Sequence, residues 1–332
     1  MSIINHQILL ARRPDGAAST ADFTLIETQV SALADGEVLV RNHFLSLDPY
    51  MRGRMNDSKS YAAPQPLGAV MGGGTVGVVA ESRNPAWQVG DTVAGMLGWQ
   101  GYAVSDGAGL KKIDDTHIPL SAYLGAVGMP GVTAWYGLNR ICKPQPGETV
   151  VVSAASGAVG SVVGQLAKRK GCRVVGIAGG AEKCRYVTQE LGFDACVDYK
   201  GGALDAALDA AAPQGIDGYF DNVGGAILDA AMARMNAHGR IAVCGAIAGY
   251  DGEALVMHNP RLILLSRLQL QGFIVSEHME DWPTALAELA GLVAKRELKF
   301  RESVAHGLAA APEAFIGLLK GRNFGKQLVK LV

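Results

Sequence analysis

Residues 148–170 read ETVVVSAASGAVGSVVGQLAKRK, a sequence that predicts a strand, a tight turn and a helix in direct succession. The apolar, β-branched residues 148–154 are typical of a buried strand. Residues 161–170 predict a helix, which Gly171 ends. The turn between them has the form A-x-x-G-x-x-G, with Ala154 at the place where glycine-rich fingerprints usually begin with glycine.

This turn is suited to hold a pyrophosphate. The small side chain of Ala154 still permits a tight turn, Gly157 lets the backbone approach an anion, and Gly160 lets the helix pack closely on the strand. The N–H groups at the start of the helix lack intrahelical acceptors and attract negative charge. We therefore expect a dinucleotide-binding site here.

The surrounding sequence alternates strands with helices. Besides the segment above, it predicts a helix at 181–191 and strands at 172–178, 195–199, 218–223, 240–246 and 268–275. This alternation predicts right-handed βαβ units and a doubly wound parallel sheet.

The flanking regions have a different pattern. Residues 7–112 contain short β-like runs separated by Gly and Pro, which predicts a mostly β domain. After a long helix that ends near Arg296, the last residues again predict a strand, a helix at 312–320 and a final strand. We expect the chain to return to its first domain, with boundaries at 1–122, 123–297 and 298–332.

Composition narrows the class of protein. The chain has 332 residues, of which 49% are hydrophobic and 18% charged, with a formal net charge of −1. This balance, without Lys/Arg runs, argues against nucleic acid as a partner. The charge-free window 149–167 coincides with the predicted strand, turn and helix, so we expect no membrane span. The five cysteines form no C-x-x-C pair, and we expect free thiols in a cytoplasmic protein.

The end of the second predicted strand favours NADPH over NADH. An NAD site places a carboxylate there to bind the ribose 2′-hydroxyl, but this chain has Gly179, Gly180 and Ala181. Lys183 and Arg185 follow and could pair with a 2′-phosphate, although Glu182 lies between them. The alternative is that these charges form an ordinary solvated helix face.

Five motifs across the chain resemble those of one family. They are HFLSLDPYMRGRM (43–55), GMPGVTAWYGL (128–138), AASGAVGSVVGQLAK (154–168), YFDNVGG (219–225) and GRNFGKQLVKL (321–331). The chain is similar to the leukotriene B4 12-hydroxydehydrogenase/prostaglandin reductase family, which includes plant alkenal double-bond reductases and bacterial curcumin reductases. The resemblance implies a zinc-independent medium-chain dehydrogenase/reductase. Its expected fold is a GroES-like, mostly β catalytic domain with an inserted Rossmann domain, in a homodimer that uses NADPH.

The resemblance also implies cofactor contacts. It places the pyrophosphate at Gly157, Ala158, Val159 and Gly160, and the 2′-phosphate at Lys183 and Tyr199. Thr133 is expected beside the nicotinamide. The remaining implied contacts are Asn222, Cys244, Gly245, Ala246, Ile247, Tyr250, Phe273, Ile274, Val275 and Asn323. Leu265 stands where mammalian members carry a tyrosine, so an eicosanoid preference is not carried over.

No metal site is expected. Zinc-dependent relatives need an early cysteine and a Gly-His-Glu turn, whereas the first cysteine here is Cys142 and the histidines are dispersed. Without a Lewis acid, reduction of a ketone is difficult. Reduction of a conjugated double bond needs only hydrogen-bond donors for an enolate oxygen.

Two tyrosines are candidates for that donor, Tyr50 and Tyr250. Each could instead be a wall of the substrate pocket, and the cofactor's ribose hydroxyl could supply the proton. The expected activity is NADPH-dependent reduction of small α,β-unsaturated ketones and aldehydes. The alternatives are a zinc-free quinone reductase and a non-catalytic NADPH-binding protein. The sequence does not identify the natural substrate.

Overall fold

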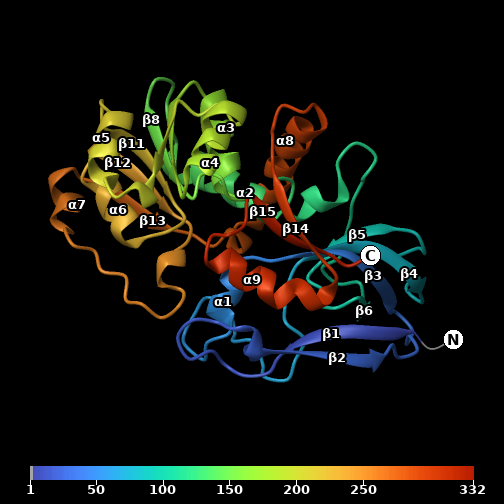
Figure 1. The fold of residues 1–332 in the computed structure, drawn as a ribbon. Helices are drawn as coiled ribbons and strands as arrows, with labels where there is room; N and C mark the ends of the chain where they lie inside the picture. The colour runs from blue at the N-terminus through green and yellow to red at the C-terminus, as the bar shows by residue number, and fades with distance from the viewer. Residues whose placement is uncertain (1–2) are drawn as a thin grey trace. The chain divides into compact units, whose positions relative to one another are not determined.

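A computed structural model describes residues 3–332 (Figure 1). The chain forms two compact units, one from the residues up to Leu124 together with Glu302–Val332, the other from Gly125–Arg301. The sequence placed these boundaries after residues 122 and 297. Within 3–332, no helix is long and apolar enough to cross a membrane.

The second unit is built on a six-stranded parallel sheet. Its strands are β8 (Thr149–Ser153), β9 (Arg173–Ala178), β10 (Ala195–Asp198), β11 (Ile216–Asp221), β12 (Met235–Val243) and β13 (Gln269–Gly272). They lie in the order β10-β9-β8-β11-β12-β13, so the chain runs outward from β8 first to one edge and then to the other. Sheets with this order of strands bind ligands where the direction reverses, which here is at the carboxyl end of β8.

Helices precede, connect and follow these strands. They are α2 (Met129–Tyr136), α3 (Gly160–Arg169), α4 (Ala181–Arg185), α5 (Leu204–Ala211), α6 (Gly225–Met232), α7 (Arg261–Leu265) and α8 (Trp282–Ala294). The predicted helix at 181–191 exists, but its second half, Tyr186–Glu190, has π-type hydrogen bonds. The residues of β8 are all buried, as expected for a strand covered on both faces.

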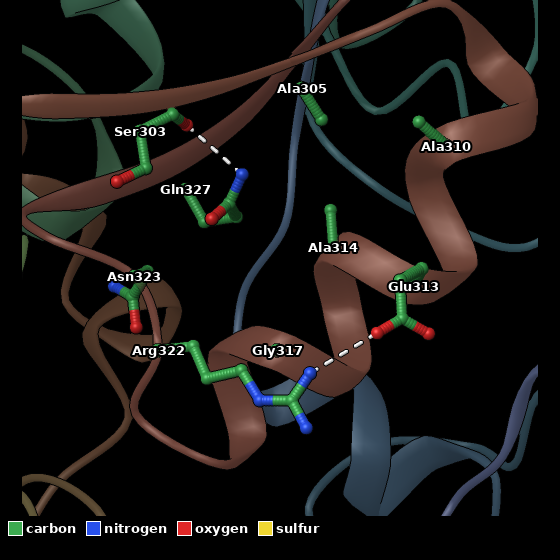
Figure 2. A pocket seen from close by; sticks show the side chains of 9 residues that line it. All are labelled: Ser303, Ala305, Ala310, Glu313, Ala314, Gly317, Arg322, Asn323 and Gln327. Atoms are coloured by element: carbon green, nitrogen blue, oxygen red, sulfur yellow. Dashed lines mark hydrogen bonds and ion pairs between the residues drawn. The ribbon is translucent and has the colours of Figure 1, made fainter.

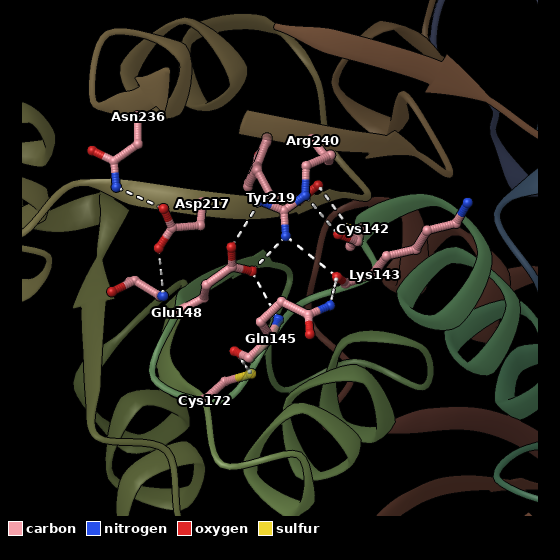
Figure 3. A network of polar contacts seen from close by, with 10 residues as sticks. Cys142, Lys143, Gln145, Glu148, Cys172, Asp217, Tyr219, Asn236 and Arg240 are labelled. Carbon is pink, nitrogen blue, oxygen red and sulfur yellow. Dashed lines mark hydrogen bonds and ion pairs between the residues drawn. The ribbon is translucent and has the colours of Figure 1, made fainter. Parts of the chain in front are cut away.

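The amino ends of the central strands are joined by a polar network (Figure 3). Arg240 on β12 donates from Nε to the Cys142 carbonyl oxygen at 2.9 Å and pairs with Glu148 just before β8. Asp217 on β11 accepts from the Thr149 N–H at 2.8 Å and from Asn236 Nδ2 at 2.8 Å. These bonds join β8, β11 and β12 at the end of the sheet opposite the carboxyl end of β8.

The first unit is mostly β. Antiparallel β1 (Ile4–Leu10) and β2 (Phe23–Gln29) form one sheet. The other comprises β3 (Val38–Ser46), β4 (Thr75–Ser82), β5 (Thr92–Gly95), β6 (Tyr102–Ser105), β7 (Lys111–Lys112), β14 (Glu302–His306) and β15 (Lys326–Lys330). Its helices are α1 (Tyr50–Arg54) and α9 (Ala311–Leu319).

The C-terminal segment belongs to the core of this first unit. β15 pairs antiparallel with β3, with Leu328 opposite Ser46. Phe315 of α9 contacts the fully buried Trp99 edge to face, at 5.7 Å between ring centroids, and Phe23 stacks on Trp99 at 5.4 Å. The predicted fold class, a mostly β domain with an inserted doubly wound parallel sheet, is therefore confirmed.

Candidate functional site

The turn after β8 brings the chain sharply back on itself. Ala154 has φ +49°, a left-handed conformation that is uncommon for a residue with a side chain. The Gly157 N–H donates to the Ala154 carbonyl oxygen at 2.8 Å, and a Cβ atom on Gly160 would lie 2.4 Å from that same oxygen. A Cβ on Gly157 would lie 3.1 Å from it. Gly160 is thus required by the contact between α3 and the turn, whereas Gly157 has more room.

The carboxyl ends of β8 and β11 meet at a buried carboxylate. Asp221, at the end of β11, is fully buried and accepts from Tyr219 Oη at 2.8 Å and Ser153 Oγ at 3.1 Å. It also accepts from the N–H groups of Val223 and Gly224, each at 3.0 Å. Burial of the Tyr219 phenol, together with the charge of this carboxylate, raises the pKa of Tyr219. Asp221 is absent from the residues that the sequence selected, because its bond to Ser153 joins residues 68 positions apart in the chain.

Asn222 and the stretch after β12 are held by the same region. Asn222 Nδ2 donates to the Ser153 carbonyl oxygen at 2.8 Å. The Cys244 N–H donates to the Asp221 carbonyl oxygen at 2.8 Å, and the Ala248 N–H to the Val223 carbonyl oxygen at 3.2 Å. The structure therefore brings together Asn222, the predicted contacts Cys244, Gly245, Ala246 and Ile247, and the carboxyl ends of β8 and β11.

A second carboxylate organises the turn after β9. Asp198, the last residue of β10, accepts from the Gly180 N–H at 2.8 Å and from the Lys200 N–H at 3.0 Å. Gly180 has φ +100°, which only glycine adopts readily. Because Asp198 binds these two amides, the turns after β9 and β10 are fixed side by side.

The side chains of Tyr199 and Lys200 lie over Gly179. A Cβ added to Gly179 would be 2.9 Å from Tyr199 Cε1 and 3.0 Å from Lys200 Cε. Partial burial lowers the pKa of Lys183, and the positive charge of Lys200 lowers it further, while Glu182 opposes both effects. Two lysines that repel one another beside a glycine turn are well suited to bind a doubly charged anion.

Lys200 is absent from the residues that the sequence selected. The signal available was its place directly after Tyr199, just beyond the third strand of the sheet. Its nearness to Lys183, however, depends on how β9 and β10 pair, with Asp198 opposite Ala178. No short motif contains that information.

Tyr50 lies in the first unit, at the start of α1. The preceding Asp48 is buried and pairs with buried Lys326 of β15, at 2.7 Å between Oδ1 and Nζ, and Ser46 Oγ also donates to it. The Arg54 guanidinium lies over the Tyr50 ring, 5.1 Å from its centroid. Burial and the Asp48 charge raise the pKa of Tyr50, and Arg54 opposes them. This phenol therefore stays protonated at neutral pH and can donate a hydrogen bond.

The other predicted cofactor contacts of the second unit have different surroundings. Thr133, on α2, donates from Oγ1 to the Met129 carbonyl oxygen at 2.7 Å. The Phe273 ring is buried against Tyr136 and Phe220. A cofactor contact from the segment 273–275 would therefore come from its backbone rather than from the Phe273 ring. Tyr250 follows the short helix Ile247–Gly249, with its hydroxyl 3.8 Å from where a Gly245 Cβ would stand.

Asn323 lines an open groove of about 370 Å³ in the first unit (Figure 2). Small residues of β14 and α9, Ala305, Ala314 and Gly317, create its space, and Glu313 and Arg322 pair across it at 3.2 Å. Asn323 Nδ2 donates to the Gly325 carbonyl oxygen at 2.7 Å. Asn323 is the one predicted cofactor contact that lines this groove.

No metal cluster is found in the part of the chain that the structure describes. Between residues 3 and 332, there is no group of three or more His, Cys, Asp or Glu side chains placed to hold an ion. The metal-free chemistry expected from the sequence stays a prediction.

Comparison with known proteins gives consistent matches over both units. Residues 6–113 match the family model described as the N-terminal domain of oxidoreductase, and residues 158–291 the one described as zinc-binding dehydrogenase. The chain is 46% identical to NADPH-dependent curcumin reductase of Escherichia coli, covering 98% of this chain and 97% of that protein. It is 42% identical to the NADP(+)-dependent 2-alkenal reductase of Nicotiana tabacum, covering 98% and 97%.

A solved structure matches the whole fold. The crystal structure of CurA from Vibrio vulnificus in complex with NADPH superposes with a TM-score of 0.93 at 45% identity, covering 98% of this chain and 99% of that one. Both the sequence and the fold are therefore shared over the full length compared.

Proposed function

Because the chain belongs to the medium-chain dehydrogenase/reductase family that contains the curcumin, prostaglandin and 2-alkenal reductases, we propose that it reduces activated carbon–carbon double bonds with NADPH. The substrate class is small α,β-unsaturated ketones and aldehydes. The observation that carries the proposal is identity above 40% over almost the full length of relatives named for this chemistry.

The residues of the second unit fit NADPH. Bound there, NADPH supplies the hydride. The turn from Gly157 to Gly160 and the first turn of α3 would hold the pyrophosphate, because the turn leads directly into α3 and the first N–H groups of a helix attract an anion. Lys183, Tyr199 and Lys200 would hold the 2′-phosphate.

The protein's chemical task is to stabilise the charge that develops on the carbonyl oxygen. Addition of hydride to the β-carbon places a negative charge on an enolate oxygen, which a phenol hydrogen bond stabilises. Tyr50 is one candidate donor, because its raised pKa keeps the proton in place. Tyr250 is the other, and the cofactor's ribose hydroxyl is the alternative to both.

A three-way assay tests this proposal. NADPH oxidation is followed with an enone, with a quinone and with no second substrate, and each is repeated after exhaustive chelation. Enone-dependent oxidation that chelation leaves unchanged supports the proposal. Turnover of the quinone alone indicates a quinone reductase, and an absence of turnover with retained NADPH binding indicates a non-catalytic protein. A loss of activity on chelation, restored by zinc, contradicts the metal-free chemistry.

We also propose that the chain forms a homodimer in the cytoplasm. Strand β13 is one edge of the parallel sheet, and such an edge offers unpaired backbone groups to a second strand. The preceding helix α7 exposes Leu264 and Leu265, at 74% and 52%. Light scattering after gel filtration should give twice the chain mass, and Leu264→Glu should lower it. Cell fractionation tests the location.

A further inference from the structure

Two cysteine side chains meet beside the proposed 2′-phosphate site. Cys184 lies on α4 and Cys196 on β10, and their Sγ atoms are 3.1 Å apart. Both side chains are partly exposed, so a small solute can reach them. Two other thiols contact carbonyl oxygens instead. Cys142 Sγ lies 3.6 Å from the Tyr219 carbonyl oxygen, and Cys172 Sγ lies 3.6 Å from the Gln145 carbonyl oxygen.

This separation needs little change to become a covalent bond. A disulfide has an S–S length of about 2.05 Å, so the two sulfurs need to approach by about 1 Å. Cys184 belongs to a short helix and Cys196 to a four-residue strand, both near the edge of the sheet. Small movements are easier there than at the centre of the sheet.

We propose that Cys184 and Cys196 are a reversible redox modification site, in which a hydroperoxide forms a disulfide that weakens binding of NADPH. The site itself follows from the sulfur geometry alone. The effect on NADPH rests on the proposed function, because it assumes that Lys183 and its neighbours bind the 2′-phosphate.

The reaction starts at Cys184. Its Sγ accepts a hydrogen bond from the Cys196 thiol, which favours the thiolate of Cys184, although burial leaves its pKa raised overall. Burial and the neighbouring sulfur raise the pKa of Cys196. The thiolate fraction at neutral pH is small, so oxidation should take minutes to hours rather than seconds.

Oxidation of the two thiols needs only one molecule of hydroperoxide. The Cys184 thiolate attacks one peroxide oxygen, the O–O bond breaks, and the leaving oxygen takes the proton that Cys184 gave up. The resulting sulfenic acid is attacked by Cys196 sulfur, and its hydroxyl leaves with the Cys196 proton as water. In sum, two thiols and hydrogen peroxide give one disulfide and two molecules of water. Two equivalents of a thiol reductant reverse the change.

The pair is directly connected to the residues that would bind the phosphate. Lys183 precedes Cys184, and Asp198, which holds the Gly180 N–H, follows Cys196 by two residues. A bond between the sulfurs therefore shifts the turn carrying Lys183 relative to the one carrying Tyr199 and Lys200. By linkage, bound NADPH should oppose the disulfide by the same factor that the disulfide opposes NADPH.

Mass spectrometry tests whether the bond forms. The intact protein is treated with hydrogen peroxide, remaining thiols are alkylated, and the chain is digested with trypsin without reduction. Cleavage after Lys183, Arg185 and Lys200 isolates the cysteines on peptides 184–185 and 186–200. We expect these two peptides joined, lighter by two hydrogens than their sum, and separated by dithiothreitol. Cys184→Ser should lose the joined species and Cys172→Ser should keep it. Failure to find it in the wild-type protein overturns the proposal.

A binding titration tests the consequence. NADPH and NADH are titrated into reduced and oxidised protein and followed by nicotinamide fluorescence, which needs no turnover. We expect the Kd for NADPH to rise at least threefold on oxidation, with NADH unchanged and with dithiothreitol restoring the first value. A joined peptide with an unchanged NADPH Kd overturns the coupling. If enone reduction is absent while this pattern holds, the proposed reaction fails and the redox site stands.

Discussion

Lys183 and Lys200 provide the two positive charges beside Gly179, and their removal should change cofactor choice. Lys183→Ala should raise the KM for NADPH and leave that for NADH nearly unchanged, because NADH lacks the 2′-phosphate. A charge-assisted contact contributes about 1.5–3 kcal/mol, which corresponds to roughly ten- to a hundredfold. Lys200→Ala should act in the same direction. Lys295→Ala, which removes an exposed lysine elsewhere in the same unit, is the control. Equal losses with both cofactors for Lys183→Ala would contradict the assignment.

The lowered pKa of Lys183 predicts that the KM for NADPH depends on pH. Partial burial and Lys200 lower the pKa of Lys183 in the cofactor-free protein, so it loses its proton at a lower pH than an ordinary lysine. Only the protonated form pairs with the phosphate. The KM for NADPH should therefore be lowest at neutral pH and rise toward alkaline pH, while the KM for NADH stays flat. Measured between pH 7 and 10, the rise should disappear in Lys183→Ala, and a rise of equal size in the variant would argue for another group.

Phenylalanine at Tyr50 or Tyr250 tests which phenol stabilises the enolate. Loss of an oxyanion donor costs about 10²–10³ in kcat. The loss should appear equally in kcat and kcat/KM, because the hydrogen bond strengthens only as the enolate forms. A tyrosine that only lines the pocket should instead change KM and substrate preference. If both variants keep kcat within tenfold, the proton comes from the cofactor's ribose hydroxyl or from water.

Single site residues were predictable from the sequence where their role depends on their neighbours in the chain. Gly157 and Gly160 could be selected because the turn, the strand and the helix are consecutive. Lys200 and Asp221 could not, since each acquires its role from strand pairing, with Lys200 brought toward Lys183 and Asp221 toward Ser153. The left-handed Ala154 was also not foreseen, although a small residue was expected there.

In the turn between β8 and α3, we expect Gly160 to matter for stability and Gly157 to matter for cofactor binding. Gly160→Ala places a Cβ 2.4 Å from the Ala154 carbonyl oxygen, so the helix must shift, at a cost of about 1–3 kcal/mol of stability. Gly157→Ala meets the same oxygen at 3.1 Å, which is easier to relieve. Gly160→Ala should therefore lower the Tm by several degrees in the absence of cofactor. Gly157→Ala should change the Tm little and weaken NADPH and NADH alike, and a larger Tm loss for Gly157→Ala would contradict this assignment.

Elements were predictable where the hydrophobic pattern is long and regular. Most strands of the parallel sheet and helices α3 and α8 lie close to their predicted positions, because apolar periodicity and end signals agree there. Strand β12 differs: it spans Met235–Val243, whereas residues 240–246 were predicted. Helix α2 was not predicted. Its residues, MPGVTAWY, are almost all buried and include proline and two β-branched residues, so they lack an amphipathic pattern. The π-type segment at Tyr186–Glu190 has no sequence signature that distinguishes it from an ordinary helix.

For the whole molecule, the pairing of β15 with β3 and the packing of Phe315 on Trp99 place the chain's end in its first unit. The sequence predicted this return from a change of pattern near Arg296, without indicating the partners. The two-unit fold was therefore predictable from local patterns and the family motifs. The natural substrate was not, since pocket residues vary freely on one fold.

The destination of the hydride tests the central claim most directly. NADPH deuterated on both faces of nicotinamide C4 is incubated with the protein and a simple enone, and the product is analysed by NMR and mass spectrometry. We predict a saturated ketone that carries one deuterium on the former β-carbon and an intact carbonyl group. An allylic alcohol with deuterium on the carbonyl carbon, or no deuterated product from any enone or enal, would contradict it.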